Sequence, residues 1–127
     1  MMYLLWLDDD IEYRNPESRC PNFGMMYTWK ECFFSKDVQE LPILWAHNYK
    51  EFVSIIIEKH VTTGFMPVEI SFDNDLGEKL EGYDCAKWLA EYCTVNGLTL
   101  PNYTVHSANP VARENIISYL ENFLKNV

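Results

Sequence analysis

Positively charged side chains are scarce in this sequence. Ten lysines and arginines stand against nineteen aspartates and glutamates in 127 residues, which gives a formal charge of −9 and a pI near 4.6. A chain with this charge repels the phosphate backbone of nucleic acid, so we expect no extended duplex-binding surface. A solvated acidic surface and a metal-binding acidic pocket give the same total charge, so the positions of the carboxylates decide between them.

Long apolar runs and paired cysteines are also missing. The apolar start of the chain has no positively charged region and no cleavage site, and no run approaches the ~20 residues of a membrane helix. We therefore expect no signal peptide, no membrane partner and a cytoplasmic location. The absence of a C-x-x-C pair argues against a zinc or redox motif. It favours reduced thiols at the four cysteines, Cys20, Cys32, Cys85 and Cys93.

Apolar residues are present in the amount that a folded domain needs. They make up 48% of the chain, and aromatic residues make up 15%. This content excludes a disordered chain, and the length is that of one ordinary domain. We therefore expect a single domain over residues 1–127, in which one core supports the whole function.

Short apolar runs alternate with helical patterns along the chain. The runs predict strands at residues 3–7, 43–46, 68–72 and 102–106. The patterns between them predict helices at about 48–60, at 82–96 and from 109 onward, with Gly64 closing the first of these segments. Alternating strands and helices are typical of an α/β domain, so we expect a short, mostly parallel sheet of about four strands.

The stretch from about residue 11 to residue 41 fits neither pattern. It contains Pro16, Pro21 and Gly24, followed by a run of methionine and aromatic residues. We expect an irregular insertion at about residues 17–41 that carries a hairpin, lies over the site, and replaces or distorts the first crossover helix.

Polar residues follow three of the predicted strands. Asp8–Asp10 end the first strand, Asp73–Asp75 end the third, and His106 and Ser107 end the fourth. Because the carboxyl ends of parallel strands meet at one edge, we expect these side chains to converge. Clustered carboxylates repel one another unless a proton or cation separates them, and oxygen ligands suit Mg²⁺, with Mn²⁺ as an alternative. The candidate metal ligands are Asp8, Asp9, Asp73 and Asp75.

The start of the last helix offers groups for an anion. Ser107 can donate a hydrogen bond, and Asn109 precedes a helix whose first N–H groups favour a phosphate. His106 could protonate a leaving oxygen or contact phosphate, and Arg113 could add a charge-assisted contact.

Each of these residues also has an ordinary structural explanation. The acids could be solvated strand-end and turn residues, and Ser107 and Asn109 could cap the helix that follows them. His106 could make a structural hydrogen bond, and Arg113 could pair with Glu12 or Glu114. The combination therefore indicates a site more strongly than any single member does.

The sequence resembles the cyclic-phosphate processing receiver domains, a divergent group of response-regulator receiver-like domains. The residues that carry the likeness are Leu7–Asp9, Ser71–Gly77 with Gly82–Asp84, and Val105–Pro110 with Arg113. The resemblance implies a receiver-like, flavodoxin-like three-layer sandwich with a Mg²⁺ pocket.

The resemblance also implies roles for individual residues. Asp8 and Asp9 match the metal-binding acids, Asp73 matches the phosphoacceptor aspartate, and Ser107 matches the switch hydroxyl. The proposed role of the group is the handling of terminal or 2′,3′-cyclic phosphates in RNA repair or nucleotide-based conflict systems. The chain departs from the pattern by lacking a fifth strand with a lysine, and by having Asn74 where the group commonly has histidine.

These features predict a divalent-metal-dependent protein that binds or hydrolyses a small phosphoester, such as a 2′,3′-cyclic phosphate on a nucleotide or an RNA end. In the enzymatic form the metal activates water or polarises the phosphoryl group. The candidate catalytic residues are Asp73, His106 and Ser107, and the candidate phosphate-binding residues are Ser107, Asn109 and Arg113. Two alternatives stay open: a non-catalytic receiver-like signalling or interaction module, and a nucleotide-sequestering protein.

Overall fold

Four strands alternate with helices along the chain, as the sequence pattern predicts. In the computed structural model, which describes residues 1–10, 12, 14–21 and 24–126, the strands are β1 (Leu4–Leu7), β2 (Ile43–Ala46), β3 (Glu69–Phe72) and β4 (Asn102–Val105). The helices are α1 (Trp29–Phe33), α2 (Tyr49–Thr63), α3 (Gly82–Asn96) and α4 (Pro110–Lys125), with a short 3-10 helix η2 (Lys36–Val38). The predicted strand boundaries agree with the observed ones to within one residue.

The strands form one parallel sheet in the order β2-β1-β3-β4. Leu7 of β1 pairs with Ala46 of β2 and with Phe72 of β3, and Phe72 in turn pairs with Val105 of β4. The four strands therefore end level with one another. The residues that follow them at this edge are Asp8, His47, Asp73 and His106.

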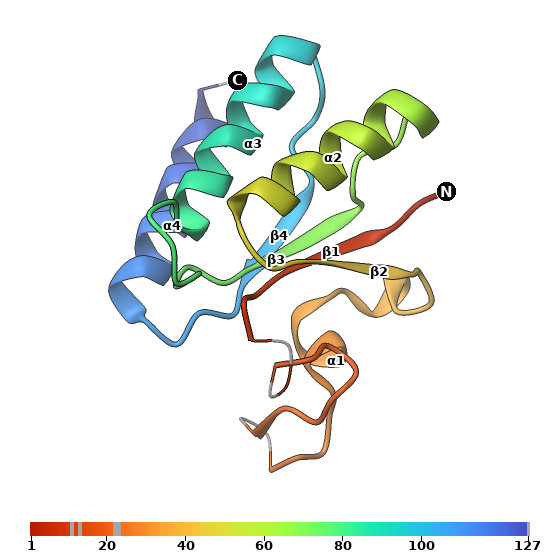
Figure 1. The fold of residues 1–127 in the computed structure, drawn as a ribbon, viewed down its shortest axis with the longest axis vertical. Coiled ribbons are helices and arrows are strands. Elements are labelled where there is room, and N and C mark those ends of the chain that lie inside the picture. Colours follow the sequence, from red (N-terminus) through yellow and green to blue (C-terminus); the bar gives the residue numbers. More distant parts are fainter. Residues whose placement is uncertain (11, 13, 22–23, 127) are drawn as a thin grey trace.

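Helices cover the two faces of the sheet unequally. The long helices α2, α3 and α4 cover one face, and α1 lies on the other (Figure 1). Successive side chains of β1 point to opposite faces of the sheet. Leu5 and Leu7 belong to the core under the long helices, whereas Leu4 and Trp6 pack with Trp29 of α1. Burial on both faces explains the continuous apolar run of β1. The expected α/β class and the flavodoxin-like three-layer arrangement are confirmed.

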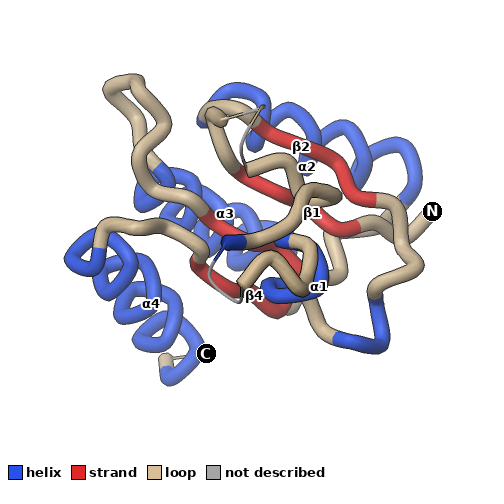
Figure 2. The backbone as a smooth tube through the Cα atoms, turned by 90° about the horizontal axis from the view of Figure 1, so that it is seen from below, coloured by secondary structure: helices blue, strands red, loops and turns tan. Residues whose placement is uncertain are grey.

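The segment of residues 17–41 forms the less regular layer. Arg19 and Thr28 make an antiparallel bridge, and Thr28 then starts α1 through a capping box with Glu31. Figure 2 views the molecule from this side and shows mostly loop around the short helices. Between β1 and β2, α1 has five residues where a regular crossover would have a long helix. The part of the predicted hairpin at residues 22 and 23 lies outside the described residues.

Side-chain caps and glycines set the ends of the long helices. The Asn48 side chain accepts a hydrogen bond from the backbone N–H of Glu51, at 2.8 Å, and so starts α2. Gly64, in the left-handed region, ends α2 after Thr63, slightly beyond the predicted end near residue 60. None of the described helices is long and apolar enough to cross a membrane. The four cysteines carry free thiols, three of them buried.

Candidate functional site

The level strand ends bring three carboxylates together at one edge of the sheet. Ligand-type oxygen atoms of Asp8, Asp9 and Asp73 all lie within 4.8 Å of one another. Asp8 and Asp73 are only 3% and 4% exposed, whereas Asp9 is exposed. Burying like charges this closely is unfavourable unless something compensates for their repulsion.

Part of the compensation comes from Arg14, which lies among these acids. Its Nε atom donates a hydrogen bond to Oδ2 of Asp8 at 2.7 Å. Its terminal nitrogens lie 3.7 Å from carboxylate oxygens of Asp9, Asp10 and Asp73, which is too long for hydrogen bonds. Burial tends to raise the pKa of Asp8, but the hydrogen bonds from His106, Arg14 and the Asp10 N–H outweigh it and hold that pKa below its ordinary value.

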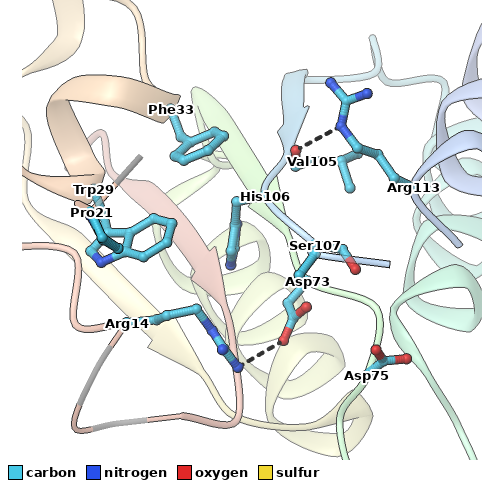
Figure 3. A pocket seen from close by; sticks show the side chains of 11 residues that line it. Arg14, Pro21, Trp29, Phe33, Asp73, Asp75, Val105, His106, Ser107 and Arg113 are labelled. Carbon is cyan, nitrogen blue, oxygen red and sulfur yellow. Dashed lines mark hydrogen bonds and ion pairs between the residues drawn. The ribbon is translucent and has the colours of Figure 1, made fainter. Parts of the chain in front are cut away.

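The second buried acid, Asp73, is less well compensated. Its Oδ1 accepts a hydrogen bond from the Asn74 N–H at 2.9 Å, but its buried Oδ2 has no hydrogen-bond partner among the described residues. The nearest cation is the Arg14 guanidinium, joined to it by a dashed line in Figure 3. Burial and the neighbouring Asp8 raise the pKa of Asp73 to about 7. A proton or a cation would therefore complete this side of the site.

His106 lies beneath Asp8, with its ring stacked on Trp6 at a centroid distance of 3.8 Å. Its Nε2 lies 2.9 Å from Oδ2 of Asp8, and its Nδ1 lies 2.8 Å from Oγ of Ser71. Burial lowers the pKa of His106 more than the contact with Asp8 raises it, which favours the neutral ring at pH 7. The neutral tautomer that suits both contacts has Nε2–H donating to Asp8 and Nδ1 accepting from Ser71.

The contacts continue from Ser71 toward the other layer. Thr104 Oγ1 lies 2.8 Å from Ser71 Oγ and 2.8 Å from the carbonyl oxygen of Phe33 in α1, and its single hydroxyl proton can be donated to either of these acceptors. His106 therefore holds Asp8 in place and connects it to the insertion. Because its side chain is fully buried and both nitrogens are engaged, His106 can exchange a proton with a ligand only through Asp8 or Ser71.

The turn after β3 is fixed to the start of α3 by Asn74 and Gly82. The side-chain oxygen of Asn74 accepts a hydrogen bond from the Tyr83 N–H at 3.0 Å, and its backbone oxygen accepts from the Gly82 N–H at 2.9 Å. A Cβ atom on Gly82 would lie 1.9 Å from the backbone oxygen of Asp73. Only glycine allows this approach, so the turn places Asp73 by close backbone packing.

Two of the predicted anion-binding residues, Ser107 and Asn109, differ in burial and in their hydrogen bonds. Ser107 is buried, and its Oγ accepts a hydrogen bond from the Asn109 N–H at 3.2 Å. Asn109 is exposed, and its side chain accepts from two N–H groups of α4, those of Val111 and Ala112. Asn109 is therefore the helix cap. Its side chain accepts hydrogen bonds from N–H groups at the start of α4, the groups that are expected from the sequence to bind phosphate.

Arg113 reaches the site from α4. Its Nε donates to the carbonyl oxygen of Val105 at 3.4 Å, and no acid forms an ion pair with it in the part of the chain that the structure describes. The predicted alternative, a pair with Glu12 or Glu114, is therefore not observed between these described residues.

A pocket of about 600 Å³ opens beside the acids. Asp73, Ser107 and Arg113 line one side of it, and Trp29 and Phe33 of α1 line the opposite side (Figure 3). Asp75 also lines the pocket, but it is exposed and outside the group of three carboxylates, so its role as a metal ligand stays a prediction.

Sequence reasoning missed Arg14, Trp29 and Phe33 as pocket residues. The last two had a detectable signal, because Thr28 and Glu31 have the spacing of a capping box, which predicts a helix start. Residues 29 and 33 are four apart, so on a helix they share a face. No comparable pattern singles out Arg14.

In the comparison with protein families, one family model matches most of the chain. The model of a family described as Cyclic-phosphate processing Receiver domain matches residues 3–122. The match runs from β1 into α4 and includes the insertion that carries α1. A search of the curated proteins and a search of the solved structures each found no match.

Proposed function

The chain belongs to the cyclic-phosphate processing receiver domain family, and from this premise we propose that it binds a small phosphoester through a divalent metal ion. Mg²⁺ is the proposed ion, with Mn²⁺ as an alternative, and Asp8, Asp9 and Asp73 are the proposed ligands. The proposed phosphoester is a 2′,3′-cyclic phosphate on a nucleotide or at an RNA end. The observation that carries the proposal is the buried Oδ2 of Asp73, which has no hydrogen-bond partner among the described residues and faces two other carboxylates.

The residues present fit a hard divalent cation. Three carboxylates offer oxygen atoms within 4.8 Å of one another, and oxygen is the ligand that Mg²⁺ prefers. Asp10 adds a fourth carboxylate near the group, and Arg14 is the cation that contacts all four. The acids at this edge therefore outnumber the positive charge that the described residues supply.

When bound, a metal ion of this kind polarises a phosphoryl group and reverses the local charge that would otherwise repel phosphate. The chain's own residues supply orientation. His106 holds Asp8 through its 2.9 Å contact, and the Arg14 terminal nitrogens, with no close hydrogen bond to the acids, can donate to a phosphate oxygen while Nε stays on Asp8. Ser107 Oγ accepts from Asn109, which leaves its hydroxyl proton able to donate to the same phosphate.

The geometry supports binding more directly than hydrolysis. Opening a cyclic phosphate requires a proton for the departing ribose oxygen. His106, the predicted acid or base, has both ring nitrogens engaged and a fully buried side chain. Turnover with His106 as the acid would therefore need a proton relayed through Asp8 or Ser71, whereas binding needs only the groups that already line the pocket.

Calorimetry with Mg²⁺ and the four 2′,3′-cyclic nucleotides tests the proposal, and phosphorus NMR of the same mixtures detects turnover. We expect binding that requires the metal and is lost in the Asp73→Asn variant. The matched control is Asp37→Asn, because Asp37 is an exposed acid in η2 away from the pocket, and this variant should bind normally. Folded protein that binds none of the nucleotides in the presence of Mg²⁺ would refute the proposal.

Phosphorus NMR and labelling with beryllofluoride separate the two alternatives. A nucleotide-sequestering protein would bind tightly without any change in the phosphorus spectrum. A non-catalytic receiver-like module would form a stable beryllofluoride adduct at Asp73 and change its oligomeric state on doing so. Asp73 Oδ2, which has no hydrogen-bond partner among the described residues, is the atom at which such an adduct would form.

A further inference from the structure

The pocket is larger than a metal ion and a phosphate group require. Its volume of about 600 Å³ lies in the range of sites for whole small organic ligands, ~300–1,000 Å³. Asp73, Ser107 and Arg113 lie on one side, Arg14 reaches Asp73 from the opposite side, and Trp29 and Phe33 of the insertion line that opposite side above Arg14 (Figure 3). The part of the ligand that fills this space meets aromatic side chains.

The aromatic side consists of Trp29 and Phe33, which project from the same face of α1. Their rings are 5.8 Å apart with an interplanar angle of 18°, so they are close to parallel. Trp29 is buried at 7% exposure, whereas Phe33 is only partly buried and lines the pocket from above in Figure 3. Trp6 and Phe34 pack behind them in the same apolar cluster, which holds this aromatic pair in place.

The aromatic pair lies close to the acidic centre. The Phe33 ring centroid is 5.7 Å from that of His106, and Nε2 of His106 is 2.9 Å from Asp8. A ligand held at the acids by its phosphate therefore needs a spacer about the size of one sugar to reach Phe33. Aromatic side chains stack on all nucleobases, because every base has a π-face.

We propose that Trp29 and Phe33 form a nucleobase-binding wall, so that the ligand is a nucleoside carrying a terminal or cyclic phosphate. The inference rests on the proposed function for the phosphate half and adds the recognition of the base. Stacking is tolerant of base identity, so all four bases bind with similar affinity. The insertion, which has no assigned role in the phosphate chemistry, supplies this wall.

One nucleotide, and not a longer strand, fills the site. A second cavity of about 850 Å³ adjoins the pocket along β4 and shares Phe33, Val105 and Arg113 with it. Among the described residues that line this second cavity, Arg113 is the one cation, and Glu121 lines it as well. A second phosphate would therefore gain little there, and a chain of charge −9 repels a longer backbone.

Calorimetry in the presence of Mg²⁺ tests the proposed base contact with five probes. They are inorganic phosphate, ribose 2,3-cyclic phosphate without a base, 2′,3′-cyclic AMP, 2′,3′-cyclic UMP, and a short RNA with a 2′,3′-cyclic end. We expect the nucleotides to bind about tenfold tighter than the baseless phosphate, the usual size of one stacking contact. The RNA should match the mononucleotides to within about threefold, because one terminal nucleotide makes the contacts.

Substitution of Phe33 separates stacking from structure. Phe33→Leu keeps an apolar side chain of similar size, so we expect the advantage of the nucleotides to disappear while inorganic phosphate binds as before. Phe65→Leu is the matched control, because Phe65 is exposed in the segment between α2 and β3, away from this edge of the sheet.

The outcomes distinguish this inference from the function on which it rests. Equal affinity for the baseless and nucleotide probes would contradict the proposed base contact and would leave the proposed phosphate site unaffected. Loss of inorganic phosphate binding in Phe33→Leu would show a structural role and also overturn the wall. RNA that binds far more tightly than the mononucleotides would overturn the single-nucleotide site, and failure of every probe would overturn both proposals.

Discussion

At the scale of single residues, Arg14 is the least expected part of the site. It brings one guanidinium to four carboxylates, but it makes a close hydrogen bond only to Asp8. In the proposed function it has two opposing effects, since its charge competes with a metal ion and attracts a phosphate. The two effects can be measured separately.

Replacing Arg14 with glutamine should move two affinities in opposite directions. We expect Mg²⁺ alone to bind about tenfold tighter, because a competing positive charge is removed, and the phosphoester in saturating Mg²⁺ to bind about tenfold more weakly. Calorimetry measures both. Lys79→Gln removes the same charge from an exposed position in the turn before α3 and should change neither affinity. Unchanged affinities in Arg14→Gln would show that the guanidinium has no part in binding.

Asp73 should make the stability of the metal-free protein depend on pH. Its pKa is raised in the folded state from an ordinary value of 3.8 to about 7, so its contribution to stability is fully present below pH 3.8 and is lost as the pH rises toward 7. In EDTA, Asp73→Asn avoids this loss because the amide stays neutral. We expect the unfolding free energy of the variant, relative to wild type, to increase between about pH 4 and pH 7 and then to level off.

Urea denaturation at several pH values checks this expectation. His106 has a lowered pKa, so its contribution to stability is present above its ordinary value of 6.5 and is lost as the pH falls. That effect has the opposite sign, but it is common to wild type and variant and cancels in the difference. A difference in stability that does not change over this range would contradict the buried, poorly compensated state of Asp73.

The side-chain details show where sequence reasoning stops at this scale. Asp8, Asp73 and Ser107 were predictable as neighbours because parallel strands end at one edge. The environment of His106 was not, because its position after β4 does not reveal that the ring turns under Asp8 and stacks on Trp6. Arg14 was not predictable either, since its placement depends on the path of an irregular loop.

At the scale of elements, the turn between β3 and α3 is the part that positions Asp73. Gly82→Ala should damage it, because the new Cβ would lie 1.9 Å from the Asp73 backbone oxygen and 2.8 Å from Cα of Asn74. Both neighbours are backbone atoms, so the turn itself must move. We expect a loss of stability of about 1–3 kcal/mol or more, as for overpacking in a core, together with loss of Mg²⁺ binding.

Thermal unfolding and calorimetry measure the two effects of Gly82→Ala. Lys87→Ala, an exposed substitution in the same helix, is the control and should keep the site intact. Wild-type stability and metal affinity in Gly82→Ala would mean that the turn does not hold Asp73 by this contact.

Element boundaries were predictable where a local signal exists. Asn48 and Asn109 cap helices as expected, and Gly64 and Gly97 end them in the left-handed conformation. The α1 segment was not placed, although Thr28 begins it with a capping box, because prolines and glycine around it outweigh one short helical signal. Its packing on the face opposite the long helices is a tertiary contact with Leu4 and Trp6, which no local pattern encodes.

At the scale of the whole molecule, the acidic charge has a specific location as well as a total. Five of the nineteen acids follow β1 and β3 directly at the carboxyl edge of the sheet, namely Asp8, Asp9, Asp10, Asp73 and Asp75. The alternating pattern of strands and helices was enough to predict this edge and the parallel sheet. It was not enough to predict that Trp29 and Phe33 of the insertion, and Arg14 just before it, line the pocket at this edge. In the proposed function, this edge binds a small phosphate ligand, while the net charge of −9 disfavours a long nucleic acid.

Diffraction from crystals grown with Mn²⁺ and inorganic phosphate, measured at the manganese absorption edge, tests the proposed site most directly. We expect one anomalous peak within ligand distance of the carboxylates of Asp8, Asp9 and Asp73, with phosphate between the metal and Ser107. Anomalous density only at other positions, or Arg14 still among the acids with no metal beside them, would contradict a metal-dependent phosphate site.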